Sequence, residues 1–495
     1  MRKRNLTTLF TIVCMLAVLL SACAGNGGSN APKESSPAST NSGGKTNADS
    51  TSKPEEDVYP ENGLPKNEKV TLKVGFANQG MGKEWFDAAV ESFEKKFPNV
   101  KLDITSSPDI AKITSTKIAA GDDDMFDMFS GGIPGGNAAL NSLVDAGKLE
   151  PVEHLWDREL YDKSGTTLKD ISLEGQFEGT TRILGQTYSL PIAGTGAGLF
   201  FDKKLFEEKG WNNNPKTWTE FTDLLAAIKA DGLIPITYPG VYPGYISNAF
   251  GPWSLFHIAM VNDNQDAFTK QFREYANPYY TSDEMIEMWN RVYELGKKGY
   301  FPKGVSALNH TQSQMQVLQR QAALASNGSW IGNEMKNATP EGFEWGFMAV
   351  PFGEEPDQTF VIRNSTGNGF HIWANKPELN KKWAMEFSLW LWNMDVQELI
   401  AEKGGMLPVR KDFTEDAARA DKLQNAPKAM FEFIDNNKVL MESGFHTVTL
   451  TDPAFQQATK LYTDSINEIA EGTKDPVPML EEAEKLMEKA RQAQK

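Results

Sequence analysis

The chain of 495 residues is almost free of cysteine, and its two cysteines, Cys14 and Cys23, both lie near the start. The rest of the chain therefore cannot form a disulfide, a cysteine-ligated zinc site or a thiol nucleophile. Histidine is also scarce, and its five copies are isolated in the sequence without the spacing of metal ligands. A Gly-x-Ser-x-Gly elbow, a P-loop and a dinucleotide fingerprint are all lacking, so we expect no metal or cofactor.

An excess of positive charge is lacking as well, because the formal net charge is −16. Removal of residues 1–22, which contain three basic and no acidic side chains, would move it to −19. A protein of this charge is not expected to bind nucleic acid or an anionic lipid surface.

The first residues read as a secretion signal over 1–22, with a basic start and an apolar run over 6–20 that is too short to span a bilayer. The run closes with Leu20-Ser21-Ala22-Cys23, which looks like a bacterial lipobox. Lipidation of Cys23 would give stable anchoring through its acyl chains. The alternative is cleavage after Ala22, which would leave a soluble exported protein. We expect an exported lipoprotein on the extracytoplasmic face of the cell membrane.

The next segment, 23–67, contains hardly any large apolar side chain and is rich in Gly, Ser, Asn, Thr and Pro. Such a composition cannot bury enough apolar surface to offset its ordering entropy. We expect a disordered tether that holds a folded body away from the membrane.

The body from 68 onward alternates strand and helix patterns. We predict strands at 70–76, 100–104, 125–129 and 198–201, and helices at 83–97, 108–120, 134–146, 203–209 and 217–230. Capping boxes at Thr217 with Glu220 and at Thr281 with Glu284 mark helix starts. Repeated βα units favour an α/β fold with a largely parallel, covered sheet.

Six segments carry a family resemblance in consistent order: 93–102, 119–128, 144–152, 185–191, 199–206 and 215–221. With the lipobox, the body resembles the extracellular solute-binding proteins of carbohydrate ABC transporters, a group that includes maltodextrin-binding protein. The resemblance implies two α/β lobes with a ligand cleft between them and crossovers near 191–196, 351–365 and 400. Lobe 1 would comprise 68–193 with 351–400, and lobe 2 would comprise 194–350 with 401–495.

The resemblance also implies a function without catalysis. A monomeric receptor would bind a mono- or oligosaccharide in the cleft, close by hinge motion and deliver the sugar to the membrane permease.

A sugar site needs an aromatic ring for the apolar face of the sugar and polar groups for its hydroxyls. The segment 322–330 meets this need, because a buried strand pattern ends in Asn327-Gly328-Ser329-Trp330. In the family the tryptophan of this motif stacks on the ligand, and Trp330 takes that place here. The alternative for Trp330, as for the second candidate Trp253, is a place in the core. Tyr245, with its neighbour Tyr242, lies in a loop that could instead pack on itself.

Further polar candidates follow the strands of lobe 1, where open α/β sheets place their ligands. They are Asn78, Gln79, Ser130, Gly131, Gly132 and Thr195. Ordinary turn chemistry is the alternative for each. Maltodextrin binders have acidic residues at several of these places, so the uncharged residues here argue against a maltodextrin ligand.

The segments 310–316, 327–336 and 340–344 look like the binding proteins for N-acetylglucosamine and diacetylchitobiose. Glu334 lies four residues after Trp330, so a helix would place both side chains on one face. Its carboxylate could accept a sugar hydroxyl or amide N–H, or could pair on the surface instead.

Two other classes of function remain open in the sequence. A secreted carbohydrate-active enzyme would need two carboxylates across a cleft, and the acidic runs 122–124 and 354–355 read as solvated turns instead. A receptor for another solute, such as a peptide or polyol, would share the same fold.

Overall fold

The computed structural model describes residues 57–78, 80–133, 136–173, 176–363, 365–367 and 369–494. The expected secretion signal, Cys23, most of the expected tether and Gln79 lie outside these ranges. Residues 56–495 form one compact unit, whose described part contains two four-stranded sheets, two two-stranded sheets and two large apolar cores. Within the described ranges, no helix is both long and apolar enough to cross a bilayer.

The sheet of lobe 1 has the strand order β11-β3-β1-β2. These strands are β1 (Val70–Ala77), β2 (Val100–Ser107), β3 (Met128–Phe129) and β11 (His371–Ile372). β1 is parallel to β2 and β3, whereas β11 runs antiparallel to β3. The predicted parallel sheet is therefore present in lobe 1, with one antiparallel strand added at its edge.

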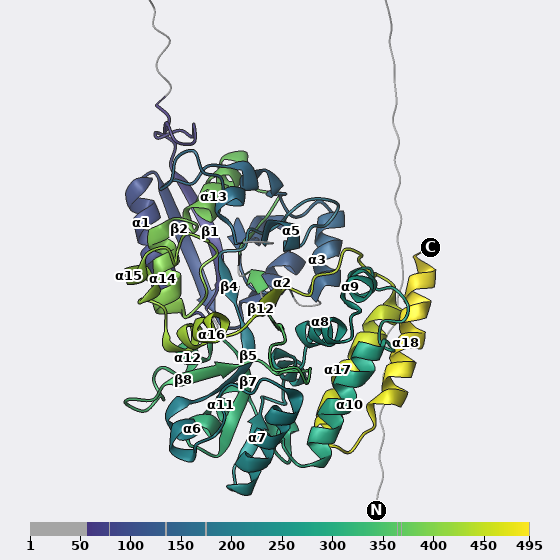
Figure 1. Cartoon of the computed structure of the whole chain (residues 1–495). Coiled ribbons are helices and arrows are strands. Elements are labelled where there is room, and N and C mark those ends of the chain that lie inside the picture. The colour runs from purple at the N-terminus through teal and green to yellow at the C-terminus, as the bar shows by residue number, and fades with distance from the viewer. Residues whose placement is uncertain are drawn as a thin grey trace, which may run out of the picture. The chain divides into compact units, whose positions relative to one another are not determined.

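The helices of lobe 1 lie around this sheet in Figure 1, and the first three, α1 to α3, match the predicted alternation. They are α1 (Glu84–Lys96), α2 (Ile110–Ala120), α3 (Gly136–Asp145), α4 (Leu168–Ile171), α5 (Gln176–Gly179), α13 (Glu378–Trp390) and α14 (Met394–Gly404). α1 lies within the predicted helix 83–97 and buries an apolar stripe, which includes Trp85, Phe86 and Phe93. The ring of Phe86 stacks on Phe76 of β1 at a centroid distance of 3.9 Å. Large aromatic side chains thus fill the space between α1 and the sheet.

The last residues of the expected tether pack onto lobe 1 instead of extending from it. Tyr59 is only 9% exposed and contacts the rings of Phe97 and Trp383. Its hydroxyl donates a hydrogen bond of 2.8 Å to Asn99 Oδ1. The described part of 23–67 therefore differs from the expectation, because a single buried aromatic ring anchors an otherwise polar segment.

The sheet of lobe 2 has the order β6-β7-β5-β8 and is mixed rather than largely parallel. Its strands are β5 (Ala197–Asp202), β6 (Ile234–Thr237), β7 (Ala322–Gly328) and β8 (Trp345–Met348). β5 is antiparallel to both β7 and β8, and only β6 and β7 are parallel. The prediction fails here because β5 continues directly from a segment that crosses between the lobes, so no helical crossover sets its direction.

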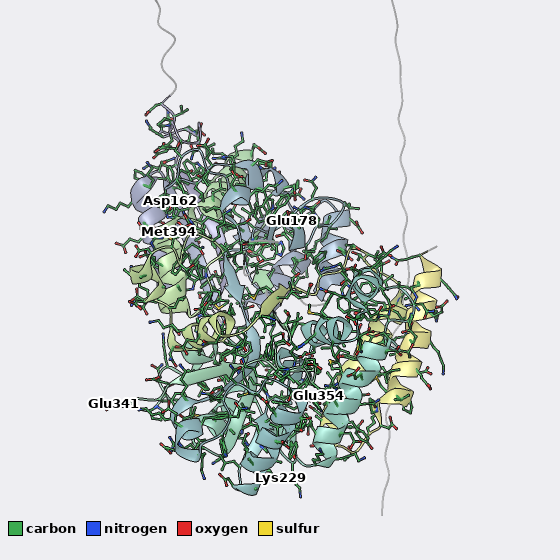
Figure 2. All side chains as sticks on the ribbon, viewed as in Figure 1. Asp162, Glu178, Lys229, Glu341, Glu354 and Met394 are labelled. Carbon is green, nitrogen blue, oxygen red and sulfur yellow. The ribbon has the colours of Figure 1, made fainter. Side chains whose placement is uncertain are left out.

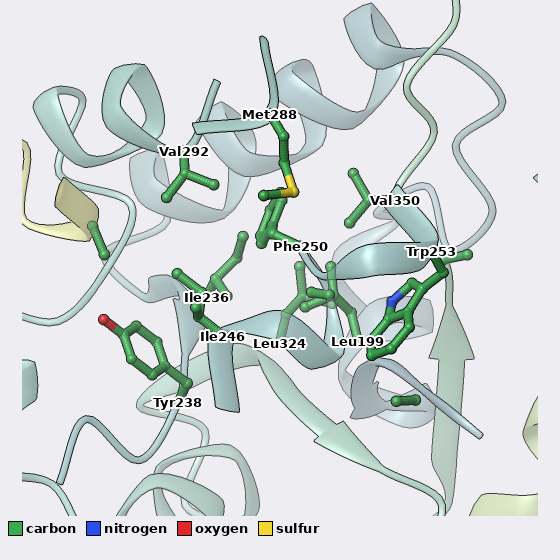
Figure 3. Packing of buried hydrophobic residues seen from close by; sticks show 14 of the residues in the cluster. Leu199, Ile236, Tyr238, Ile246, Phe250, Trp253, Met288, Val292, Leu324 and Val350 are labelled. Carbon is green, nitrogen blue, oxygen red and sulfur yellow. The ribbon is translucent and has the colours of Figure 1, made fainter. Parts of the chain in front are cut away.

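The helices of lobe 2 begin with predicted elements and end with a C-terminal pair. They are α6 (Lys203–Lys209), α7 (Trp218–Ala230), α8 (Pro252–Val261), α9 (Gln265–Arg273), α10 (Asp283–Lys297), α11 (His310–Leu318), α12 (Ile331–Met335), α16 (Asn425–Asp435), α17 (Pro453–Ala470) and α18 (Pro476–Ala493). α17 and α18 pack on each other and on α10 (Figure 1). Figure 3 shows the core between the sheet and α10, where Leu199, Leu324 and Met288 lie close together.

The capping predictions are right for α7 and one residue off for α10. Thr217 caps α7, because its hydroxyl accepts the Glu220 N–H at 3.1 Å. For α10 the cap is Ser282 rather than Thr281, and its hydroxyl accepts the Met285 N–H at 3.2 Å. Both residue types satisfy free N–H groups at a helix start, so composition alone does not choose between neighbours.

Crossing segments meet between the lobes in a small patch of backbone pairing. β4 (Ala193–Thr195) pairs antiparallel with β10 (Ser365–Gly367). Gly194 also exchanges backbone hydrogen bonds with Leu407, at 2.7 and 2.9 Å. The chain therefore passes between the lobes close to two of the expected positions, near 191–196 and 365.

The structure divides the lobes differently from the expected boundaries at 351 and 401. β9 (Phe360–Arg363) pairs with β12 (Val439–Glu442), and Phe360 lies in the lobe 2 core, so 351–363 packs with lobe 2. After 401, the buried Arg410 returns to lobe 1 through its ion pair with Asp162, at 2.7 Å. Asp162 also accepts the backbone N–H of Met394, and both residues are labelled in Figure 2. The short α15 (Ala417–Ala420) follows before the chain reaches α16 in lobe 2.

Candidate functional site

A cavity of about 620 Å³ lies beside the crossing segments and is lined from both lobes. Its volume lies in the range of ordinary small-molecule sites, roughly 300–1,000 Å³. The lining residues are Ala77, Gly80, Met81, Pro108, Ile110, Ala111, Gly131, Gly132, Thr195, Tyr242, Tyr245, His310, Trp330, Glu334, Arg363, Gly367 and Met406.

Lobe 1 supplies a wall of small and apolar groups. Ala77 ends β1, and Gly131 follows shortly after β3, so the carboxyl ends of two parallel strands open onto the cavity. Gly131 has a φ of +88°, and a Cβ atom there would lie 2.9 Å from both Ala77 Cβ and Ile110 Cγ2. Only glycine fits this turn without strain, and it brings the backbone of lobe 1 close to the cavity.

Lobe 2 supplies an aromatic wall. Trp330 follows the buried strand β7 and caps the start of α12, so the strand end delivers its indole ring to the cavity. The ring of Tyr245 lies edge-on to Trp330, with centroids 6.5 Å apart. His310 stacks on Tyr242 at 4.5 Å and meets Tyr245 edge-on at 4.4 Å. The four rings form a continuous surface on which the apolar face of a ring-shaped ligand could pack.

Two charged side chains also line the cavity, and both come from lobe 2. Glu334 Oε2 accepts a hydrogen bond of 2.5 Å from Gln314 Nε2 on α11. Burial raises the pKa of Glu334, and the hydrogen bond from Gln314 partly offsets this. Arg363 ends β9 and donates from Nη1 to Asn248 Oδ1 at 3.3 Å. The cavity therefore combines aromatic faces with one acceptor group and one donor fork.

The structure brings six of the expected site residues together at this cavity: Gly131, Gly132, Thr195, Tyr245, Trp330 and Glu334. The helical argument for Glu334 and Trp330 agrees with the geometry, because the Glu334 N–H donates to the Trp330 carbonyl oxygen at 3.0 Å. Asn78 is partly buried and is not among the lining residues, although its carbonyl oxygen accepts the Gly82 N–H at 3.1 Å.

Three other candidates have structural roles away from the cavity lining. Ser130 is 3% exposed, and its hydroxyl accepts the Ala77 N–H at 3.0 Å. Asn327 is 1% exposed, and its side-chain oxygen accepts the Gly328 N–H at 2.8 Å. Trp253 lies in the lobe 2 core, as Figure 3 shows, and its indole N–H donates to the Asn248 carbonyl oxygen. Each polar group is used within the fold, as buried groups require.

Sequence reasoning missed two residues of the lobe 2 wall. His310 begins the segment 310–316, but in the sequence it was weighed only as a metal ligand. Burial lowers its pKa. Arg363 carried no local signal, because its place in the cavity depends on the pairing of β9 with a strand near the end of the chain. Only a contact map could have found it.

Two α/β lobes, crossing segments between them and an aromatic cavity at their junction define a two-lobed binding protein of the periplasmic type. The chain belongs to the bacterial extracellular solute-binding proteins, whose family model matches residues 79–398.

Two curated relatives and one solved structure show the range of the similarity. A multiple sugar-binding protein of Streptococcus mutans is 25% identical over 316 residues, which cover 62% of this chain and 66% of that protein. The sn-glycerol-3-phosphate-binding periplasmic protein of Brucella abortus is 25% identical over 49% of this chain and 54% of its own length. The match thus spans between half and two thirds of these relatives. The solved structure of a chitin oligosaccharide binding protein shares the fold, with a TM-score of 0.62, 20% identity and coverage of 86% of this chain and 99% of that one.

Proposed function

We propose that this protein is the sugar-binding receptor of an ABC importer, which binds a mono- or oligosaccharide between its lobes and delivers it to the membrane permease. The observation that carries the proposal is the placement of Trp330, Tyr245 and Glu334 around one interlobe cavity. Aromatic faces suit the apolar side of a pyranose, and a carboxylate beside them suits its hydroxyls.

The division of the cavity between two lobes suits transport. A ligand that contacts both walls binds more tightly when the lobes are closed than when they are open. This difference in affinity shifts the equilibrium toward the closed state. The permease would then recognise the closed, loaded receptor.

The relatives support a small polyhydroxylated ligand. One is named for multiple sugars and another for sn-glycerol-3-phosphate, and a structural neighbour is named for chitin oligosaccharides. An N-acetylglucosamine oligomer remains within the proposal, with Glu334 as acceptor for an amide N–H.

The cavity argues against the alternative of a carbohydrate-active enzyme. Glycoside hydrolases use two carboxylates across the scissile bond. Among the described residues that line the cavity, Glu334 is the only carboxylate. We therefore propose binding without chemical change.

The proposal includes a lipid anchor on Cys23 that holds a monomeric receptor at the extracytoplasmic face of the membrane. Tethering would raise the effective concentration of loaded receptor at the permease. Cys23→Ala should release the protein into the medium while sugar affinity stays unchanged, as cell fractionation and calorimetry would show. Retention of this variant in the membrane fraction would contradict the anchor.

The ligand class is tested by calorimetry and thermal shift with the purified protein against neutral and acidic sugars, polyols and short peptides. A ligand at 100 times its Kd should raise the free energy of unfolding by about 2.7 kcal/mol. Binding of peptides with no response to any sugar would overturn the proposal. Release of shorter products from chitin or starch oligosaccharides would favour the enzyme instead.

A further inference from the structure

Arg363 is an unusual arginine in this protein because it has no acidic partner. In the described ranges every other arginine has a carboxylate oxygen within 4 Å: Arg158, Arg182, Arg273, Arg291, Arg320, Arg410, Arg419 and Arg491. Arg363 has none among the described residues, and it is also the only lysine or arginine among those that line the cavity.

The carboxylate opposite Arg363 in the strand pairing is bound to other groups. Glu442 is its cross-strand neighbour in the pairing of β9 with β12. However, the Glu442 carboxylate accepts from Arg273 Nη2 at 3.0 Å and from the Gly444 N–H at 2.8 Å. Glu442 therefore lies opposite Arg363 in the strand pairing, but its carboxylate binds Arg273 and the Gly444 N–H instead.

What holds Arg363 is a neutral cradle. Its guanidinium carbon lies 5.5 Å from the ring centroid of Trp253, and Nη1 donates to Asn248 Oδ1. These contacts orient the guanidinium plane without neutralising it. Trp253, which the sequence proposed as a ligand contact, is thus a positioning residue for this cation.

An unpaired cation that is partly buried is costly, and burial accordingly lowers the pKa of Arg363. An arginine nevertheless stays charged, and its fork of N–H donors matches carboxylate and phosphate oxygens in a bidentate pair. The group that would complete this arrangement is an anion brought in by the ligand.

We propose that the cavity takes an acidic sugar, whose carboxylate or phosphate oxygens are bound by Arg363 while its ring packs on Trp330. This inference rests on the proposed function and specifies its ligand class. Glu334 lies in the same cavity and serves as an acceptor for hydroxyls of the same ligand.

The first test uses the unaltered protein and ligand pairs that differ only in the acidic group. Suitable pairs are digalacturonate with its methyl ester, glucose 1-phosphate with glucose, and glycerol 3-phosphate with glycerol. In at least one pair we expect the acidic member to bind about tenfold tighter or more, with a preference that shrinks as salt is added. The pair that shows the preference identifies the anion as carboxylate or phosphate.

The second test is Arg363→Gln, with Arg320→Gln as a matched control outside the cavity. The Arg320 side chain is 41% exposed and pairs with the buried Asp202 and the exposed Glu208. Arg363→Gln should weaken the acidic ligand by about thirtyfold and leave its neutral counterpart within about threefold, whereas Arg320→Gln should change neither. Arg363→Lys should give an intermediate loss, because it keeps the charge but not the fork. Thermal unfolding of each variant establishes that it is folded.

The outcomes separate this inference from the proposed function. If neutral sugars bind as tightly as their acidic counterparts, or if Arg363→Gln weakens both members of a pair equally, the acidic subsite is overturned and the sugar receptor stands. If only glycerol 3-phosphate binds, the anion subsite stands and the sugar is overturned. If no member of any pair binds, the acidic subsite is overturned, and the wider screen of sugars, polyols and peptides described above decides the sugar receptor separately.

Discussion

The two lobes meet at one cavity but contribute to it in different ways. Lobe 1 offers small and apolar residues, such as Ala77, Gly131 and Gly132, whereas lobe 2 offers the aromatic rings and both charged groups. We therefore expect lobe 2 to carry most of the ligand discrimination and lobe 1 mainly to cover the ligand. An asymmetric site of this kind allows the lobes to close without having to align two sets of directional contacts.

The sheets of the two lobes also differ in how they supply residues to the cavity. The parallel strands of lobe 1 end together at the cavity, which leaves room only for short turns. In lobe 2 the connections between strands bring Tyr245 and His310 to the cavity, beside Trp330, which follows directly after β7. The four predictions below test the comparison, from the largest expected effect to the smallest.

The largest effect should come from the polar anchor of lobe 1. The Arg410 side chain is 2% exposed and pairs with Asp162 and Asp412. Arg410→Ala removes the ion pair of Asp162 and leaves Asp412 with Lys163 as its remaining cation, so we expect the free energy of unfolding to fall by about 3–5 kcal/mol. Arg320→Ala in lobe 2, where the side chain is 41% exposed, should cost less than about 1 kcal/mol. Denaturant unfolding measures both, and equal losses would contradict the role of Arg410 as the polar anchor of lobe 1.

The second largest effect should be a loss of stability in acid, caused by a buried histidine of lobe 2. His257 is fully buried, its Nε2 lies 2.8 Å from Gln358 Oε1, and burial lowers its pKa to about 4. The unfolded chain binds this proton below about pH 6.5, whereas the native protein does so only below about pH 4. Stability should therefore fall as pH drops from 6.5 to 4, by on the order of 3 kcal/mol.

His257→Asn should reduce this pH dependence to about half, because burial also lowers the pKa of His446 to about 4, although the substitution lowers stability at pH 7. His154→Gln, at an exposed position of lobe 1, serves as the control and should leave the dependence intact. Thermal unfolding across this pH range measures the slope. If His257→Asn keeps the wild-type slope, another group governs the acid response.

Within the cavity, Trp330→Ala should have the larger effect on binding. Loss of a stacking ring should weaken the sugar by about thirtyfold, or about 2 kcal/mol. Trp211→Ala removes a partly buried tryptophan that packs on Phe206 at 5.3 Å, away from the cavity lining. Calorimetry should find its affinity unchanged. If Trp330→Ala leaves the affinity unchanged, the ligand does not pack on the aromatic wall.

The smallest effect should come from the lobe 1 wall. A Cβ atom at Gly132 would meet no atom within 4 Å, so Gly132→Ala adds little to the cavity. We expect the affinity to change by less than about threefold. A loss as large as that of Trp330→Ala would show that lobe 1 also discriminates between ligands.

Local patterns predicted much of this fold from the sequence. The apolar stripe of α1 and the turn from β7 to Trp330 and Glu334 follow from side-chain periodicity over a few residues. The antiparallel direction of β5 and the cap at Ser282 were missed, because both depend on neighbours that periodicity does not describe.

The same distinction between local pattern and tertiary packing applies to the candidate site. Trp330 was predicted from its motif and the family resemblance, and Glu334 from its spacing of four residues to Trp330. Trp253 and Asn327 were also expected at the ligand but lie packed in the fold. A tryptophan in a sequence shows that a large ring must be placed but not which surface it meets.

The sequence by itself determined the order of strands and helices, the scarcity of cysteine chemistry and the polar-aromatic motif at the end of β7. Only the tertiary structure decided that Arg363 lies at the same cavity as Trp330, unpaired because Glu442 is bound to Arg273. Periodicity acts over a few residues and is written in the sequence. The charge balance of a cavity depends on segments far apart in the chain, and it exists only when they have packed together.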